Sequence, residues 1–306
     1  MDQILKTLKE VIHFTKHPSD KNKAPASFIQ NLNLLIRLLI ILFIIVSLIL
    51  ILFHYINTYT FDFKSYGKFD DAFANKTLVS ILFLVSVLAP VLEEVIFRLP
   101  LKYSRNYIFR GIDYIFKTKK VYIFWTKNYH FFYYTSIVAF GLVHLTNYDL
   151  ESYWFLALAP IIILPQLLAG IVLSFIRMKS GLLWAISLHS LYNGILTIGG
   201  ILFFNTTTIT NDNNESYSLK IEQITYGLKK EIYSNSKIKN DSLHYFEVRN
   251  NSLRNILKQL NENPQHYKNL NTRLNILLEK NDDKLHKKVI TTELRKHFSI
   301  KEQFTQ

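Results

Sequence analysis

The sequence contains an apolar run that is too long and too continuous for an ordinary soluble core. Residues Leu34 to Ile56 are aliphatic or aromatic almost throughout, with Arg37 and His54 lying near the two ends. A helix needs about 20 such residues to cross a hydrocarbon layer of about 30 Å. The run therefore predicts a transmembrane helix, and the remaining segments have to be interpreted as parts of a membrane protein.

Further apolar blocks predict more membrane spans. They are Leu78 to Leu101, Phe131 to Leu145, Trp154 to Ile176 and Leu182 to Phe204. Prolines inside these blocks are compatible with a membrane bundle, because neighbouring helices satisfy the backbone groups that proline frees. The predicted fold class is an all-α polytopic membrane protein, a bundle of about five transmembrane helices with a small α+β polar domain at the C-terminal end.

The first 33 residues form an amphipathic and polar N-terminal segment. Ile4, Leu8, Val11 and Ile12 recur at helical spacing, with lysines elsewhere on the wheel. This pattern fits a helix lying in the membrane interface and equally a helix packed on another part of the protein. The segment lacks the cleavage-site pattern of a signal peptide, so the first span is expected to stay attached.

The distribution of charge indicates topology rather than nucleic-acid binding. The formal net charge is +13, and basic residues gather before the first span and between the second and third spans. The loop between the first two spans instead balances lysines against aspartates. This alternation follows the positive-inside tendency. The N-terminus and the 102–130 loop are expected in the cytoplasm, in a plasma or inner membrane, and no nucleic-acid partner is expected.

The composition changes abruptly after Phe204. The stretch "NTTTITNDNNESYS" is rich in Asn, Thr and Ser and predicts a linker. A strand over residues 243–249, a capped helix from Leu253 and two helical stretches, around residues 267–280 and 283–298, are predicted to follow. The chain is thus divided into residues 1–33, a catalytic membrane core at 34–204, and an extramembrane α+β appendage at 205–306, which five spans would place outside the cytoplasm.

Three charges lie inside the second apolar block. Glu93 and Glu94 are adjacent on a helix and point about 100° apart, while Glu94 and Arg98 are one turn apart and share a face. An unpaired charge near the middle of a bilayer costs at least about 2.5 kcal/mol. An ion pair between Glu94 and Arg98 is therefore predicted, and Glu93 needs a partner on another helix.

Later blocks supply partners for Glu93. Phe140 and His144 share a face of the third block, and His189 and Asn193 share a face of the fifth. Counted inward from the basic ends at about 1.5 Å per residue, these polar side chains and Glu93 lie at matching depths, roughly 13 to 21 Å below the inner surface. We expect one constellation, although interhelical hydrogen bonds that only stabilise a bundle are the alternative.

Such a constellation suits hydrolysis. A carboxylate beside an imidazole can hold and deprotonate a water, while a second imidazole and a carboxamide can donate hydrogen bonds to an oxyanion. Glu93, His144 and His189 could instead ligate a zinc ion that activates the water, and spacing alone leaves both possibilities open. The sequence has no cysteine and no H-E-x-x-H pair, which excludes Cys-ligated metals and that zinc-protease motif.

Three short motifs carry a family resemblance. "EEVIFR", "FGLVH" and "HSLYN" occur in order within residues 77–200. They resemble the E-E-x-x-x-R, F-x-x-x-H and H-x-x-x-N motifs of the CPBP family, the type II CAAX prenyl endopeptidases and bacteriocin-processing enzymes. The resemblance implies an intramembrane endopeptidase in which Glu93 and His144 activate the attacking water and His189 and Asn193 form the oxyanion hole. Glu94 and Arg98 match supporting positions, and no metal is expected.

The resemblance also limits what is expected of partners. The implied substrate is a membrane-associated protein or peptide, with lipidated tails included, and the oligomeric state is not predicted. The alternative function is a non-catalytic bacteriocin-immunity or scaffold protein of the same fold that binds a membrane partner. A proton-relaying transporter ranks third, because the broken-helix repeats of many transporters are not visible.

Overall fold

The computed structural model describes residues 2–21, 26–59, 76–148, 153–203, 206–224, 231–239, 242–280 and 288–298. It separates into two compact units, a helical unit (1–67 and 82–196) and a sheet unit (68–81 and 197–306). Most of the loop between the first two predicted spans lies outside the described residues. The predicted boundaries at residues 33 and 204 stay predictions.

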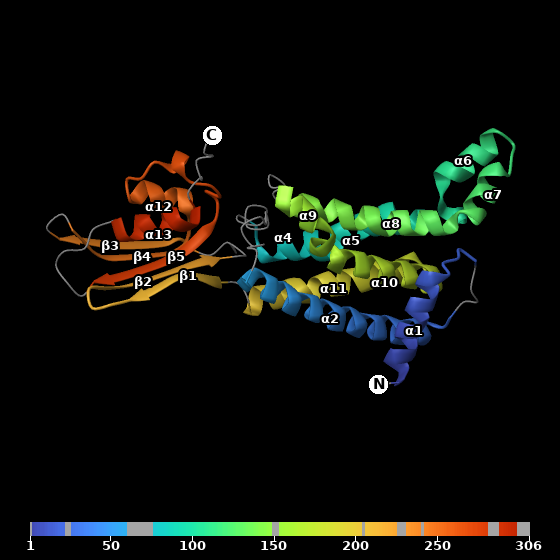
Figure 1. The fold of residues 1–306 in the computed structure, drawn as a ribbon, viewed down its shortest axis with the longest axis horizontal. Coiled ribbons are helices and arrows are strands. Elements are labelled where there is room, and N and C mark those ends of the chain that lie inside the picture. Colours follow the sequence, from blue (N-terminus) through green and yellow to red (C-terminus); the bar gives the residue numbers. More distant parts are fainter. Residues whose placement is uncertain are drawn as a thin grey trace. The chain divides into compact units, whose positions relative to one another are not determined.

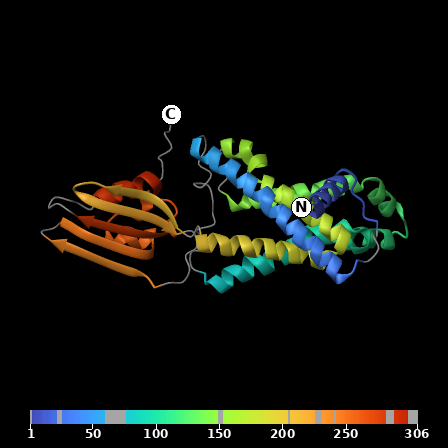
Figure 2. The same ribbon diagram turned by 90° about the horizontal axis from the view of Figure 1, so that it is seen from below.

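Helices that run in alternating directions make up the helical unit (Figures 1 and 2). Its α-helices are α1 (Asp2–Lys16), α2 (Phe28–Tyr59), α5 (Ala89–Glu93), α6 (Tyr107–Ile115), α7 (Lys120–Lys127), α8 (Tyr129–Val143), α9 (Tyr153–Ile162), α10 (Leu164–Ser180) and α11 (Leu182–Phe203), and α4 (Leu78–Phe83) begins the pass that contains α5. Shorter helical segments are η2 (Leu84–Leu88), η3 (Glu94–Arg98), η4 (Leu99–Leu101), η5 (Tyr103–Arg105) and η6 (His144–Asn147).

Three helical stretches of the described residues are long and apolar enough to cross a membrane. They are Phe28–Phe53, Leu78–Leu101 and Leu182–Phe203, and they coincide with the first, second and fifth predicted blocks. The third block forms the 15-residue helix α8, about 22 Å long, which is short for a span. The fourth block is divided between α9 and α10, with Pro160 inside α9 and Pro165 in the first turn of α10. The count of five spans stays a prediction.

Helix α1 packs on the helical unit through its apolar face. Val11 and Phe14 are buried, and the ring of Phe14 meets Tyr133 of α8 and Phe175 of α10 edge-on. Glu10 forms an ion pair with Lys179 at the end of α10. Of the two predicted possibilities, packing against another part of the protein is the one found for this face.

The sheet unit is a five-stranded antiparallel sheet with strand order β1-β2-β5-β4-β3. The strands are β1 (Thr206–Asn213), β2 (Tyr217–Ile224), β3 (Tyr233–Lys239), β4 (Ser242–Ser252) and β5 (Arg273–Lys280). Helices α12 (Leu253–Gln259) and α13 (Lys288–Phe298) lie on one face of the sheet (Figure 1). Their apolar side chains close a core with Leu219, Val248 and Ile276 of the central strands.

The structure corrects two predictions in this unit. The stretch predicted as a linker forms β1 and the start of β2, and the stretch predicted as helical around residues 267–280 contains β5. In β5 the side chains of Leu274, Ile276 and Leu278 alternate and are buried, which is the period of a strand rather than a helix. The strand at residues 243–249 is confirmed within β4, as is the helix after it, which Ser252 caps by accepting from the Asn255 amide.

Replacing Leu257 with Ala should destabilise the sheet unit by about 2 to 5 kcal/mol, because this fully buried side chain fills the core under α12. Hydrogen exchange of β4 and β5 amides in the full-length chain is the measurement, and it should accelerate more than about tenfold. Lys258→Ala, on the exposed side of the same helix, is the matched control and should change little. Equal exchange in both variants would contradict the assignment of this core.

Candidate active site

The pass that carries the paired carboxylates is not a regular α-helix. The π-helical segments η2 and η3 flank α5, and each ends with an amide that donates five residues back, from Ala89 to Leu84 and from Leu99 to Glu94. Pro90 and Pro100 each follow two residues after the end of a π-helical segment. Proline has no N–H and its ring clashes with the carbonyl four residues earlier, so a widened turn before it relieves both problems.

The predicted ion pair between Glu94 and Arg98 is confirmed. Arg98 Nη1 lies 3.7 Å from Glu94 Oε1, and both side chains are fully buried. The guanidinium carbon of Arg98 also lies 3.8 Å from the centre of the Phe140 ring, in a cation–π arrangement. Gly170 of α10 leaves room for this stack, because a Cβ there would lie 3.3 Å from Arg98 Nη2.

His189 of α11 stands between the two carboxylates. Its Nδ1 lies 3.0 Å from Glu94 Oε1 and its Nε2 lies 3.7 Å from Glu93 Oε2. An ionised carboxylate only accepts hydrogen bonds, so Nδ1 carries the proton that it donates to Glu94. Glu94 therefore fixes the orientation of the imidazole, and Glu93, whose side chain is 25% exposed, is the more accessible carboxylate.

His144 lies at the end of α8, with Phe140 between it and Arg98. Its Nδ1 lies 2.8 Å from the Phe140 carbonyl and its ring meets the Phe140 ring edge-on at 4.7 Å between centroids. Since a carbonyl can only accept, Nδ1 is the donor, and Nε2 of the neutral ring is left as an acceptor. His144 thus has a nitrogen able to take a proton.

Asn193 lies one turn after His189 on α11. Its Nδ2 donates to the carbonyl of Val85 in η2, at 3.1 Å. The carboxamide has a second N–H that this bond does not use. The structure therefore ties Asn193 to the irregular helix that carries Glu93 rather than directly to either histidine.

Sequence reasoning missed Arg177. This buried side chain donates from Nε to the carbonyl of Arg98 at 3.0 Å and from Nη2 to that of Leu99 at 3.4 Å. Both carbonyls lie at the start of the short segment η4, and the arginine gives each of them a side-chain donor. A basic residue directly after the end of the fourth apolar block was the available signal, but it resembles an ordinary cytoplasmic flank.

The cluster holds two carboxylates, Glu93 and Glu94, and one guanidinium, Arg98. A His189 ring with a proton on both nitrogens would donate from Nε2 as well as from Nδ1. The three predicted metal ligands do not form a preformed cluster, since no group of three His, Asp or Glu side chains among the described residues is arranged to hold a metal ion.

The comparisons with known proteins identify the family of this region. Residues 75–195 match the family described as type II CAAX prenyl endopeptidase Rce1-like, which confirms the resemblance carried by the three motifs. No curated protein and no solved structure matches the chain. The family implies intramembrane protease activity in general and, with the three apolar helices, an integral membrane protein with a protein substrate.

Replacing Arg98 with Met should lower the free energy of unfolding by about 3 to 5 kcal/mol, because it leaves the Glu94 charge buried without its cation. The double variant Arg98→Met with Glu94→Leu should recover part of this loss. Thermal unfolding of the full chain in detergent is the measurement, with Lys127→Met, at an exposed position, as the control. A single variant that melts with the control would show that the pair is dispensable.

Proposed function

Because residues 75–195 form a domain of the Rce1-like family, we propose that this protein is an intramembrane endopeptidase in which Glu93 activates a water molecule for attack on a peptide bond. The observation that carries the proposal is the placement of Glu93. It is the accessible member of an adjacent pair of carboxylates, and it faces an imidazole that the buried member, Glu94, holds in place.

His144 completes the water-activating pair. Glu93 and His144 are the two groups that can accept a proton, since Glu93 Oε2 makes no hydrogen bond among the described residues and His144 Nε2 remains an acceptor. A carboxylate and an imidazole that share a water divide the tasks of orienting it and removing its proton. The ring of Phe140 holds His144 from one side.

His189 and Asn193 supply the oxyanion hole in this proposal. Nε2 of a protonated His189 donates toward the space next to Glu93, and the second N–H of the Asn193 carboxamide is available one turn further along α11. Donors that are held before the substrate arrives stabilise the negative charge that develops on the carbonyl oxygen. Arg98 and Glu94 act by positioning, through the ion pair that fixes His189.

The proposed substrate is a membrane-associated protein or peptide, and lipidated tails are included. The site lies on apolar passes, so the scissile bond reaches it from within the bilayer or along its surface. The charge distribution supports a cytoplasmic N-terminus and an extracytoplasmic sheet unit in a plasma or inner membrane. No metal takes part in this mechanism.

Glu93→Gln should lower the rate of cleavage about 10²- to 10⁴-fold, because it keeps the size of the side chain but removes the base. The measurement is a comparison of new peptide termini in membranes from cells that carry either the wild-type chain or the variant. Termini that disappear in the variant identify the substrate at the same time.

Glu231→Gln, the same chemical change at an exposed position of the sheet unit, is the control and should leave the termini unchanged. Both variants should accumulate and melt like the wild type. If the termini of the Glu93 variant match those of the wild type at equal abundance, the endopeptidase proposal fails and binding of a membrane partner takes its place.

Chelation of divalent metals should leave the activity of the purified enzyme unchanged, because the proposed mechanism uses protein groups alone. The measurement is the cleavage rate of the identified substrate with and without a strong zinc chelator. Loss of activity that added zinc restores would establish the zinc alternative with Glu93, His144 and His189 as ligands.

A further inference from the structure

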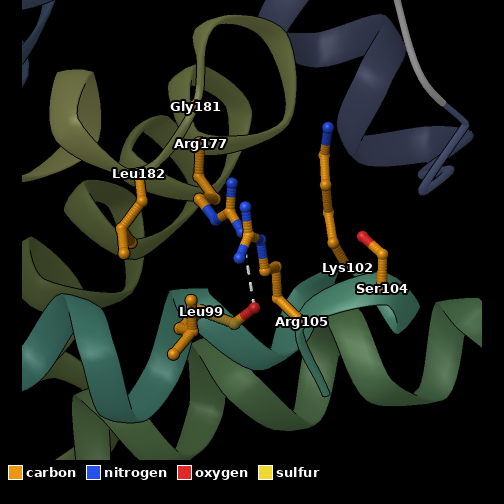
Figure 3. A pocket seen from close by; sticks show the side chains of 7 residues that line it. All are labelled: Leu99, Lys102, Ser104, Arg105, Arg177, Gly181 and Leu182. Carbon is orange, nitrogen blue, oxygen red and sulfur yellow. Dashed lines mark hydrogen bonds between the residues drawn. The ribbon is translucent and has the colours of Figure 1, made fainter. Parts of the chain in front are cut away.

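A pocket of about 470 Å³ opens where the second apolar pass ends and α11 begins. Figure 3 shows its side chains, which come from the end of that pass, the segment after it and the turn between α10 and α11. Three of the lining residues are basic, namely Lys102, Arg105 and Arg177. Leu99 and Leu182 add apolar walls, and none of the lining residues is acidic among those described.

Arg177 gives the pocket a fixed positive charge. Its side chain is 4% exposed, and two of its nitrogens donate to the Arg98 and Leu99 carbonyls. These neutral acceptors hold the guanidinium in place without cancelling its charge. A buried arginine that binds only carbonyls favours the binding of an anion, because the attraction between the two charges offsets part of the free energy lost when the cation is removed from water.

The other charges around the pocket leave it positive. Burial lowers the pKa of Lys102, and the nearby Arg177 lowers it further, while Asp20 opposes this effect. The Asp20 carboxylate accepts hydrogen bonds from the Trp125 indole and the Tyr103 amide, so it also serves to hold these segments together. Among the described residues, Asp20 acts on Lys102 and Glu94 acts on Arg177, so the three cations of the pocket outnumber the neighbouring carboxylates.

The segment next to the pocket has the character of a membrane interface. Helix α6 begins two residues after Arg105 and forms a hairpin with α7 at one end of the helical unit (Figure 1). Ile108, Tyr114 and Phe116 in this hairpin are 75%, 85% and 72% exposed. Exposed apolar side chains among lysines are typical of a helix that lies in the headgroup layer. The pocket thus opens near the level at which lipid phosphates lie.

We propose that this pocket binds the phosphate of an anionic lipid headgroup. The phosphate interacts with the positive charges of Arg177, Lys102 and Arg105 together. The Ser104 hydroxyl can also donate a hydrogen bond to it. The acyl chains leave along Leu99 and Leu182, which begin the apolar surfaces of two membrane passes. This site is separate from the carboxylate cluster and does not require that the protein cleave a peptide bond.

The test measures the melting temperature of the full chain in an uncharged detergent while short-chain phosphatidylglycerol, short-chain phosphatidylcholine or inorganic phosphate is added. Phosphatidylglycerol should raise the melting temperature of the wild type in a saturable manner. The double variant Lys102→Gln with Arg105→Gln should bind it at least about tenfold more weakly. The control is Lys119→Gln with Lys120→Gln, which removes the same charge at exposed positions outside the pocket and should bind like the wild type.

Several results would overturn the proposal. An equal shift with phosphatidylcholine would mean that the anionic character of the headgroup is not recognised, and an equal shift with inorganic phosphate would make the ligand a free anion. A peptide with a free carboxylate that acts as strongly as phosphatidylglycerol would assign the pocket to a substrate. Unchanged affinity in the double variant would place the lipid elsewhere. If the double variant unfolds, Arg105→Gln alone, at an exposed position, carries the same test.

Discussion

The buried charge of Glu94 is the constraint on which the helical unit depends. Its side chain is fully buried in an apolar bundle, so its charge must be met within the protein. Arg98 meets it from the same pass and His189 meets it from α11. Because Arg98 also stacks on Phe140 of α8, the Glu94–Arg98 pair links three helical segments and fixes the distances among the groups that surround it.

The irregular backbone around this carboxylate lacks some regular helical hydrogen bonds, and nearby groups compensate for them. Pro90 and Pro100 interrupt the hydrogen bonds of the pass on either side of the two glutamates, and π-helical turns absorb the interruption. Where the pass ends, Arg177 donates to the carbonyls of Arg98 and Leu99 at the start of η4. Asn193 donates to the Val85 carbonyl in the first π-helical turn. Polar side chains from neighbouring helices thus make an unusual backbone stable in an apolar setting.

The sequence was sufficient to predict those features that depend only on the spacing of residues within one helix. The Glu94–Arg98 pair followed from a separation of one turn and from the cost of an unpaired charge, and the motifs predicted which passes carry polar groups. The spacing could not show that His189, rather than His144, lies against both carboxylates, since that depends on how the helices are rotated. Arg177 was missed for the same reason. The stretch that forms β5 was predicted as a helix. Its alternation of Leu274, Ile276 and Leu278 is too short to decide between helix and strand, and pairing with β2 and β4 makes it a strand.

The two adjacent glutamates lie in different environments, which suits the two different roles that the proposed mechanism gives them. Glu94 is fully buried and its Oε1 accepts from His189, so it orients the imidazole and is not accessible to water. The Glu93 side chain is 25% exposed and is held only loosely, with its Oε2 at 3.7 Å from His189, which suits the base of the proposed mechanism. Neighbouring positions on a helix point about 100° apart, so one can face the bundle interior and the other the space beside it. In the proposed mechanism Glu94 therefore positions His189 while Glu93 acts as the base, and the two carboxylates are not interchangeable.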